Sequence, residues 1–286
     1  MKKPLLFLIS TLVFAGCSSE KETPVTPLAE KKPVTLEQHG DSRVDDYYWL
    51  RERENPEVIS YLEAENTYTE VALAPFTGLQ GILYDEMKLR IKQDDESVPY
   101  RVGEYFYYVR YVEGGEYPIY ARKKGSLTAP EQIVLDVNKL AGDAEFFSVR
   151  GFSVSPDGNT AAYGVDTVGR RFYDLYFIDL ESGALLSDKI DDTTSNFSWA
   201  NDSQTILYGK QHPETLRSYQ VRRYRLGDPD DALVYEEPDE ENYLYLSKST
   251  SSAYFYLSSS QTVSTEVRYL SANSPTDAPV VFLPRE

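Results

Sequence analysis

Short runs of hydrophobic and polar positions repeat along the second half of this 286-residue chain. Residues 152–164 and 197–209 align at a separation of 45, with Phe, Ser, Thr, Tyr and Gly at matching positions. Each copy has an apolar run, a polar turn (Pro156-Asp157-Gly158 or Asn201-Asp202-Ser203) and a second apolar run, which predicts two strands joined by a turn. A period of about 40 to 50 residues is typical of the four-stranded blades of a β-propeller.

Two fainter copies flank this pair. Strand-like runs at residues 98–111 and 118–126 precede it, and the run at 245–256 places Tyr256 48 residues beyond Tyr208. About four blades are therefore expected between residues 93 and 286, which makes the fold mainly β. A β-sandwich of evenly spaced strands is the alternative that the pattern leaves open.

The segment before the blades, residues 34–92, has helical rather than strand periodicity. Asn55 is a good N-cap and Pro56 suits a first helical turn, so a helix should begin there and end near Pro75. A second helix is expected over Gly81–Lys92. Its buried side would carry Ile82, Leu83, Met87 and Ile91. We interpret this segment as a helical N-terminal extension.

The N-terminal string MKKPLLFLISTLVFAGCSS has the pattern of a secretory signal peptide, with two lysines, an apolar run and small residues. The apolar run is too short to span a bilayer as an ordinary transmembrane helix. LVFAGC also resembles a bacterial lipobox, which predicts a lipoprotein signal peptide over residues 1–16 and lipid attachment at Cys17. A plain signal peptide with an incidental cysteine is the alternative.

The residues that follow Cys17 help to predict where in the cell the protein is located. Residues 17–33 are rich in Ser, Pro, Thr, Lys and Glu, which predicts a flexible tether. Ser18 and Ser19 differ from the Asp that commonly retains lipoproteins at the inner membrane. The expected location is therefore the bacterial cell envelope, with a lipid anchor in the outer membrane and the protein in the periplasm.

Composition and charge narrow the classes of function. The chain is 41% hydrophobic and 13% aromatic, with 24 Tyr, which suits an ordered β-rich protein. Its formal net charge of −17 disfavours nucleic acid as a partner, because phosphate binding needs clustered Lys and Arg. The same charge favours basic peptides by electrostatic steering, or it is simply a solvated acidic surface. No phosphate loop, dinucleotide fingerprint or Cys/His zinc spacing occurs, so no cofactor or metal is expected.

Three stretches, residues 39–70, 154–183 and 216–227, carry a more specific resemblance, above all through the strings YYWLR and DTVGRR. From about residue 34 onward, the chain resembles the N-terminal half of oligopeptidase B-type members of the prolyl oligopeptidase family of serine peptidases. In that family a seven-bladed propeller caps an α/β-hydrolase domain. The resemblance implies hydrolysis of short peptides, with a preference for cleavage after Arg or Lys, and it makes the blades here the first four of seven.

The catalytic chemistry of such a hydrolase needs a serine on a G-x-S-x-G turn, followed by an Asp and a His. The sequence contains no G-x-S-x-G, and its nearest string, Gly151–Ser155, opens a predicted strand. His39 and His212 are the only histidines, and neither stands beside a nucleophile. No catalytic residue is therefore assigned, and we expect an N-terminal portion of a longer enzyme that lacks the α/β-hydrolase domain. A lipid-anchored, non-catalytic binding protein with a propeller-like fold is the alternative.

The DTVGRR string supplies the remaining candidate residues. Arg170 and Arg171 are possible contacts to acids of a hydrolase domain, whereas the alternative is a hairpin loop with solvated charges. The acidic runs at residues 94–96 and 236–241 lack the ligand spacing of a calcium loop, and we interpret them as solvated surface. The expected partners are thus short peptide substrates, the hydrolase domain and the membrane that holds the lipid.

Overall fold

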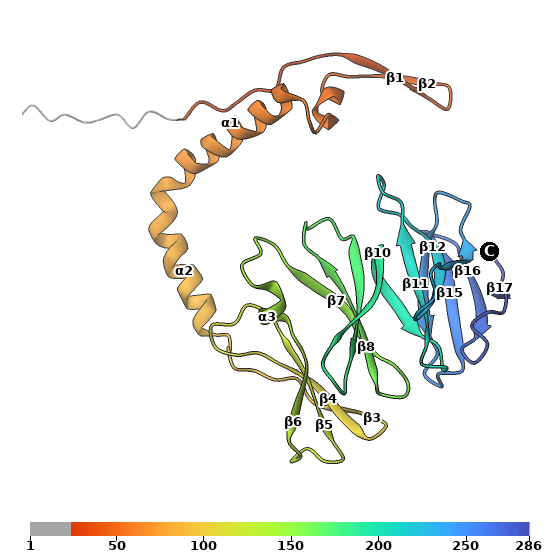
Figure 1. Ribbon diagram of the computed structural model, residues 1–286. Helices are drawn as coiled ribbons and strands as arrows, with labels where there is room; N and C mark the ends of the chain where they lie inside the picture. Colours follow the sequence, from red (N-terminus) through yellow and green to blue (C-terminus); the bar gives the residue numbers. More distant parts are fainter. Residues whose placement is uncertain (1–23, 286) are drawn as a thin grey trace, which may run out of the picture. The chain divides into compact units, whose positions relative to one another are not determined.

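A computed structural model of the protein describes residues 24–285 (Figure 1). The chain divides into two compact units at the junction between Ile91 and Lys92. Cys17 and the leader lie outside the described residues, so lipid attachment stays a prediction. Within the described range, no helix has the length and apolar character needed to cross a membrane.

The first unit begins with a hairpin that the sequence pattern did not reveal. Strands β1 (Val34–Gln38) and β2 (Asp41–Asp45) pair antiparallel around His39 and Gly40. Both turn residues have positive φ, 53° and 83°, as the tightest two-residue hairpin turns require. The extension that the sequence predicts to be helical therefore begins with a pair of strands.

A small core follows the hairpin. The 3-10 helix η1 (Tyr48–Arg51) buries Trp49, whose indole N–H donates to the Glu30 carbonyl at 3.0 Å. The Lys32 amine lies 4.5 Å from the centre of the same ring, and Val58 is 3% exposed. An aromatic ring that packs with a cation and still satisfies its own N–H ties the chain before the hairpin to the chain after it.

Helix α1 (Pro56–Leu73) begins where the sequence predicts. The Asn55 side chain accepts a hydrogen bond of 3.0 Å from the backbone N–H of Glu57, which satisfies one of the free donors of the first turn. The helix ends before Pro75, in a single 3-10 turn, η2 (Ala74–Phe76). Both boundaries therefore follow from capping residues and a proline.

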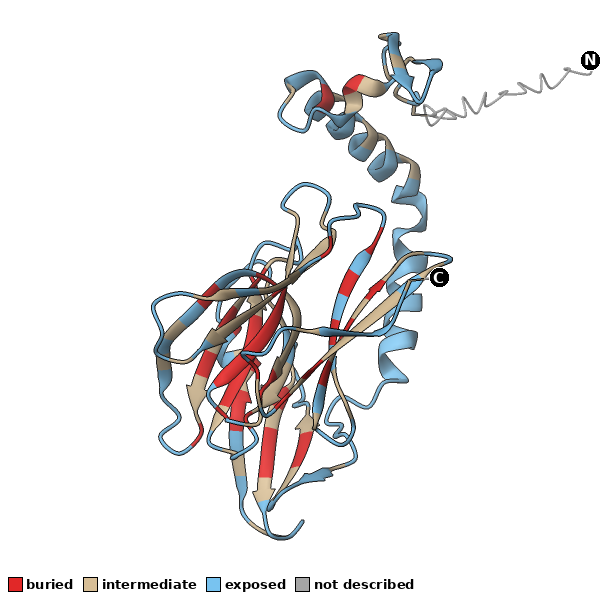
Figure 2. Ribbon diagram, turned by 90° about the vertical axis from the view of Figure 1, so that its right-hand side faces the viewer, coloured by how far each residue is buried: buried red, intermediate tan, exposed pale blue. Residues whose placement is uncertain are grey.

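Helix α2 (Thr77–Leu89) begins and ends earlier than the predicted range of 81–92. Its expected buried side is exposed in the described chain, because this unit supplies no second layer to cover it. Figure 2 shows α1 and α2 as largely exposed helices. The four apolar side chains expected on the buried side are all exposed: Ile82 by 66%, Leu83 by 47%, Met87 by 61% and Ile91 by 67%.

The second unit contains four antiparallel blades of four strands each (Figure 1). The first comprises β3 (Tyr100–Val102), β4 (Tyr105–Arg110), β5 (Ile119–Lys124) and β6 (Glu131–Asp136), and α3 (Val137–Ala141) follows it. The second comprises β7 (Ser148–Val154), β8 (Thr160–Asp166), β9 (Tyr173–Asp179) and the first part of β10 (Leu185–Trp199). The third comprises the rest of β10, β11 (Thr205–Gln211), β12 (Ser218–Arg225) and β13 (Ala232–Glu236). The fourth comprises β14 (Tyr243–Lys248), β15 (Tyr254–Ser260), β16 (Thr265–Ser271) and β17 (Val280–Leu283).

The second and third blades share β10. Its residues 185–193 pair with β9, its residues 193–199 pair with β11, and the register shifts on both sides. One strand thereby closes one blade and opens the next, which joins the two blades into a seven-stranded sheet. The prediction of a mainly β fold with about four blades is confirmed, and the sandwich alternative is wrong.

Equivalent turns explain the sequence repeat. A backbone hydrogen bond closes the first hairpin of three blades, from Ser155 to Thr160, from Ala200 to Thr205 and from Ser249 to Tyr254. The fourth blade therefore follows the third at a separation of 49, so the predicted separation of 48 is wrong by one residue. Leu257, not Tyr256, takes the place of Tyr208, and it is 1% exposed. A slip of one residue matters because it exchanges the two faces of a strand.

The core lies between successive blades. Phe177 of the second blade packs with Trp199 and Tyr208 of the third, and Leu207 of the third packs with Phe255 of the fourth. Burying a side chain of this size stabilises the fold by roughly 1.5–3 kcal/mol. Side chains also donate hydrogen bonds between neighbouring blades, from Arg122 to the Gly158 carbonyl, from Trp199 to the Ser153 carbonyl and from Asn196 to the Leu246 carbonyl. The Asn196 side-chain oxygen in turn accepts the backbone N–H of Leu246. These bonds satisfy backbone groups at the blade junctions.

Candidate functional site

The loop between β8 and β9, residues 167–172, forms one wall of a hollow of about 480 Å³ together with the strand residues at its two ends. The other walls come from the start of β7, from β10 and from the end of β11, so the second and third blades both contribute. Its lining includes Phe146, Ser148, Arg150, Arg171, Tyr173 and Ser195. The hollow therefore contains one of the two arginines that the sequence singled out.

A buried carboxylate holds the loop in shape. Asp166, which is 3% exposed, accepts backbone hydrogen bonds from Val168 at 2.8 Å and Gly169 at 2.9 Å through one oxygen. Its other oxygen accepts the backbone N–H of Arg171 at 2.7 Å. Both oxygens are thus occupied by the loop itself, as in the local side-chain-to-backbone turns that Asp favours.

Two further features fix the backbone at Arg171. Its φ of 62° is uncommon for a residue with a side chain, and such conformations persist where the surroundings enforce them. The side-chain amide of Gln211, on the third blade, donates to the Arg171 carbonyl at 2.8 Å. Gly169 has a φ of 83°, and an added Cβ would contact the Phe146 ring at 3.7 Å. The loop is held from its own blade and from the next one.

Positive side chains outnumber negative ones in the lining of the hollow, with two arginines against the single carboxylate of Asp166. Arg150 and Arg171 are exposed, and no salt bridge joins either of them to an acid within residues 24–285. The hydroxyl groups of Ser148, Tyr173 and Ser195 also line the hollow, and they have no hydrogen-bond partner within residues 24–285. The hollow therefore presents two guanidinium groups and three hydroxyl groups, while its one carboxylate is engaged elsewhere.

The structure separates the two arginines of the DTVGRR string. Arg171 lines the hollow, whereas Arg170 is exposed and is not part of the lining. Sequence reasoning missed Arg150, which precedes Gly151 at a register shift of β7. A glycine inside a strand pattern is a signal of such a bulge, and bulges re-aim the neighbouring side chains.

The other residues considered from the sequence have structural roles. The ring nitrogen Nδ1 of His212 accepts backbone N–H groups of Glu214 and Thr215, both at 3.3 Å, within the β11–β12 hairpin. His39 lies in the β1–β2 turn, and Gly151 lies in β7, within the predicted strand. Among the described residues, no group of three or more His, Cys, Asp or Glu side chains is arranged to hold a metal.

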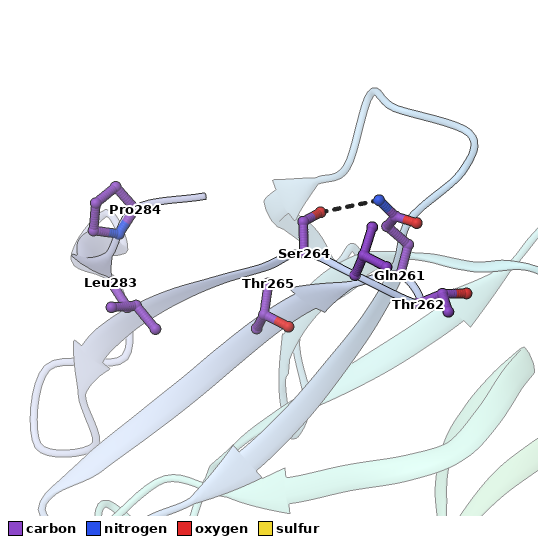
Figure 3. A pocket seen from close by; sticks show the side chains of 7 residues that line it. Gln261, Thr262, Ser264, Thr265, Leu283 and Pro284 are labelled. Atoms are coloured by element: carbon purple, nitrogen blue, oxygen red, sulfur yellow. Dashed lines mark hydrogen bonds between the residues drawn. The ribbon is translucent and has the colours of Figure 1, made fainter. Parts of the chain in front are cut away.

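A second hollow, of about 320 Å³, lies beside the β15–β16 hairpin and the end of β17. Figure 3 shows its lining, in which the Gln261 side-chain amide donates to the Ser264 hydroxyl at 3.2 Å. No charged side chain lines it, so it offers less chemistry than the arginine hollow.

The repeated four-stranded blades define the described residues 92–285 as a β-propeller module. Residues 26–286 match the family model described as the N-terminal β-propeller domain of prolyl oligopeptidase. The chain belongs to the prolyl oligopeptidase family.

Relatives and solved structures agree with this assignment. The chain is 40% identical to dipeptidyl aminopeptidase BI of Pseudoxanthomonas mexicana, over 100% of this chain and 42% of the relative. It is 35% identical to protease 2 of Moraxella lacunata, over 87% of this chain and 37% of the relative. The structure of oligopeptidase B from Leishmania major matches with a TM-score of 0.84 and 28% identity, over 92% of this chain and 40% of that structure. The chain thus spans about two fifths of the length of these proteins.

Proposed function

We propose that this propeller serves a serine peptidase that hydrolyses short peptides, and that it limits which substrates reach a hydrolase domain. The observation that carries the proposal is the family match over residues 26–286, together with the backbone agreement with oligopeptidase B. The sequence has no G-x-S-x-G turn, so the nucleophile belongs to the hydrolase domain. The propeller contributes selection rather than bond cleavage.

The proposed substrates are peptides with basic residues, cleaved after Arg or Lys. The formal charge of −17 supports this choice, because an acidic surface raises the encounter rate of cationic ligands. The resemblance to oligopeptidase B points the same way. Removal of N-terminal dipeptides, which the name of the Pseudoxanthomonas mexicana relative suggests for that protein, is the competing specificity.

Two surfaces are proposed to contact the hydrolase domain. One is the exposed apolar side of α2 and the residues just after it, where Ile82 and Met87 in the helix and Ile91 beyond its end are each more than half exposed. The other is the β8–β9 loop at Arg170, which is exposed, lies outside the lining of the hollow and carries no salt bridge in the described chain. Large exposed apolar patches mark interaction sites, and an arginine without an acid partner suits a charged contact.

A chimera tests the function. Residues 24–286 would be joined to the part of dipeptidyl aminopeptidase BI that follows its aligned segment, and the chain alone would serve as the control. The chimera should be labelled by a fluorophosphonate probe and should hydrolyse Arg-linked chromogenic tetrapeptides, whereas the chain alone should show neither reaction. A chimera that is labelled but leaves all peptides intact would contradict the function. One that releases only dipeptides, with no preference for Arg, would contradict the specificity.

A further inference from the structure

We propose that the hollow between Arg150 and Arg171 binds the C-terminal carboxylate of a peptide. The ligand class rests on the proposed function, which makes peptides the substrates. The binding site itself rests on the second and third blades alone. It gives the propeller a role in recognising one end of the substrate.

The first argument is charge. In a chain with a formal charge of −17, Arg150 and Arg171 share one hollow without an acid partner in the described residues. Two like charges on one hollow repel each other, and an anion between them would remove that repulsion. Arg is the side chain best suited to a carboxylate, because its planar guanidinium donates two parallel hydrogen bonds to the two oxygens.

The second argument is that the site is built before any ligand arrives. Asp166 holds the loop with three backbone hydrogen bonds, which engage both of its oxygens. Gln211 fixes the Arg171 carbonyl from the third blade. A site whose backbone is already fixed pays little ordering entropy when it binds a ligand. The hydroxyl groups of Tyr173 and Ser195 add donors to the same space.

The third argument is size and lining. The volume of about 480 Å³ lies within the range of sites that take small ligands. It has room for a carboxylate and one terminal residue, and the exposed Phe146 ring offers apolar contact to that residue's side chain. A polypeptide has only one backbone carboxylate, at its C-terminus, so a site of this kind favours short peptides, in which that end is always near the bound residues.

Calorimetric titration of the purified protein tests the proposal. The ligands are the tetrapeptide Gly-Gly-Arg-Phe with a free C-terminal carboxylate and the same peptide with a C-terminal amide. We expect the free acid to bind about tenfold more tightly than the amide, as for one good charge-assisted contact. Arg171→Gln and Arg150→Gln should each remove that difference, and Arg171→Lys should retain only part of it.

Arg170→Gln is the matched control, because Arg170 is the exposed neighbour that does not line the hollow. It should leave the tenfold difference intact, and circular dichroism should show that every variant is folded. Equal binding of acid and amide by the unaltered protein overturns the proposal. The proposal is also overturned if Arg170→Gln removes the difference in affinity between acid and amide as fully as Arg171→Gln does. Displacement of the peptide by inorganic phosphate at a lower concentration than by acetate would also overturn it, since the site would then prefer another anion.

The titration distinguishes a carboxylate at the end of a peptide from a carboxylate of the hydrolase domain. The chain alone brings no hydrolase domain, so any preference for the acid comes from the peptide end. It also requires no hydrolysis, so a failed chimera with a successful titration would reject the proposed function and leave the carboxylate site standing as a peptide-end binding site.

Discussion

At the residue scale, single carboxylates shape the turns of this propeller. Asp157 accepts the hydroxyl of Ser155 at 2.6 Å and the backbone N–H of Asn159 at 3.1 Å. Burial would raise the pKa of Asp157, but these hydrogen bonds outweigh it and lower the pKa below its ordinary value. Asp202 takes the same place 45 residues on, where it accepts Thr205 through backbone and hydroxyl. The repeat therefore preserves a turn-forming acid, as well as the apolar runs.

A partly buried ion pair gives a pH-dependent prediction. Arg222 donates two hydrogen bonds of 2.6 Å to Asp231, and the Tyr208 hydroxyl donates to the same carboxylate. The bonds from Arg222 lower the pKa of Asp231, although burial opposes them. Asp231→Asn should lower the free energy of unfolding by roughly 1.5–3 kcal/mol near neutral pH, because hydrogen bonds to charged groups contribute about that much.

The sign of the pH effect follows from the direction of the shift. The stabilisation from Asp231 is present above its ordinary pKa of 3.8, and it is lost as the pH falls through the lowered pKa of the folded state. Urea unfolding at several pH values should therefore show the gap between the protein and Asp231→Asn closing in acid. The exposed neighbour Asp230, changed to Asn, should make little difference. A gap that stays constant with pH would contradict the assignment.

Cys17 carries a prediction that only the sequence supports. If the cysteine of LVFAGC is acylated, metabolic labelling with a fatty acid in a bacterial host should mark the protein, and Cys17→Ala should abolish the label. The label should fractionate with the outer membrane, because Ser18 and Ser19 follow the cysteine. Equal labelling of both proteins would exclude this anchor.

At the element scale, a glycine in β7 sets how closely two strands approach. Gly151 has a φ of 68°, and an added Cβ would lie 2.5 Å from the Ser195 carbonyl oxygen and 2.5 Å from the Phe197 ring. Gly183, in the turn after β9, has a φ of 73° with nothing within 4 Å. Gly151→Ala should cost roughly 2–4 kcal/mol through strain and overlap, against about 1 kcal/mol for Gly183→Ala.

Urea unfolding of the two variants measures this difference directly. The matched pair separates backbone strain, which both share, from the clash with β10, which only Gly151 has. Equal losses at the two sites would mean that β7 and β10 are less closely packed than the structure shows.

Individual elements are the part of the structure that the sequence predicts well. Strand, turn and strand are local patterns, so hairpins such as 152–164 are visible from residue types alone. The apolar side of α2 is visible too, but whether Met87 is buried depends on a second layer that lies outside the local sequence. Arg150, in β7, and Arg171, in the β8–β9 loop, line one hollow only because the fold brings these two segments together. Their association follows from topology, which the local pattern does not contain.

At the scale of the whole molecule, the fourth blade leaves apolar surface uncovered. Phe282 is 67% exposed and Val280 is 55% exposed, and the Phe282 ring lies 6.2 Å from that of Tyr269. Strand β17 ends its sheet, so in the described chain its outer edge pairs with nothing. Unpaired edges and apolar patches both promote association.

We therefore expect the purified chain to form oligomers and to bind a hydrophobic dye. Phe282→Glu should shift the chain toward monomers in size-exclusion chromatography, because it places a charge in the apolar patch. Leu127→Glu is the control, since Leu127 is 52% exposed but lies in the β5–β6 loop of the first blade. A chain that elutes as a monomer before any substitution would contradict this prediction.

The strand that two blades share limits where such a chain can tolerate insertions and recombination during evolution. The other blades are separated by connections with exposed segments at residues 142–146 and 238–241, and added sequence there would lengthen a surface connection. Between the second and third blades, β10 continues without a loop from Leu185 to Trp199. An insertion at that point would displace partners in both blades at once. Recombination and length variation should therefore be tolerated at two of the three blade boundaries, with the central pair inherited as a single block.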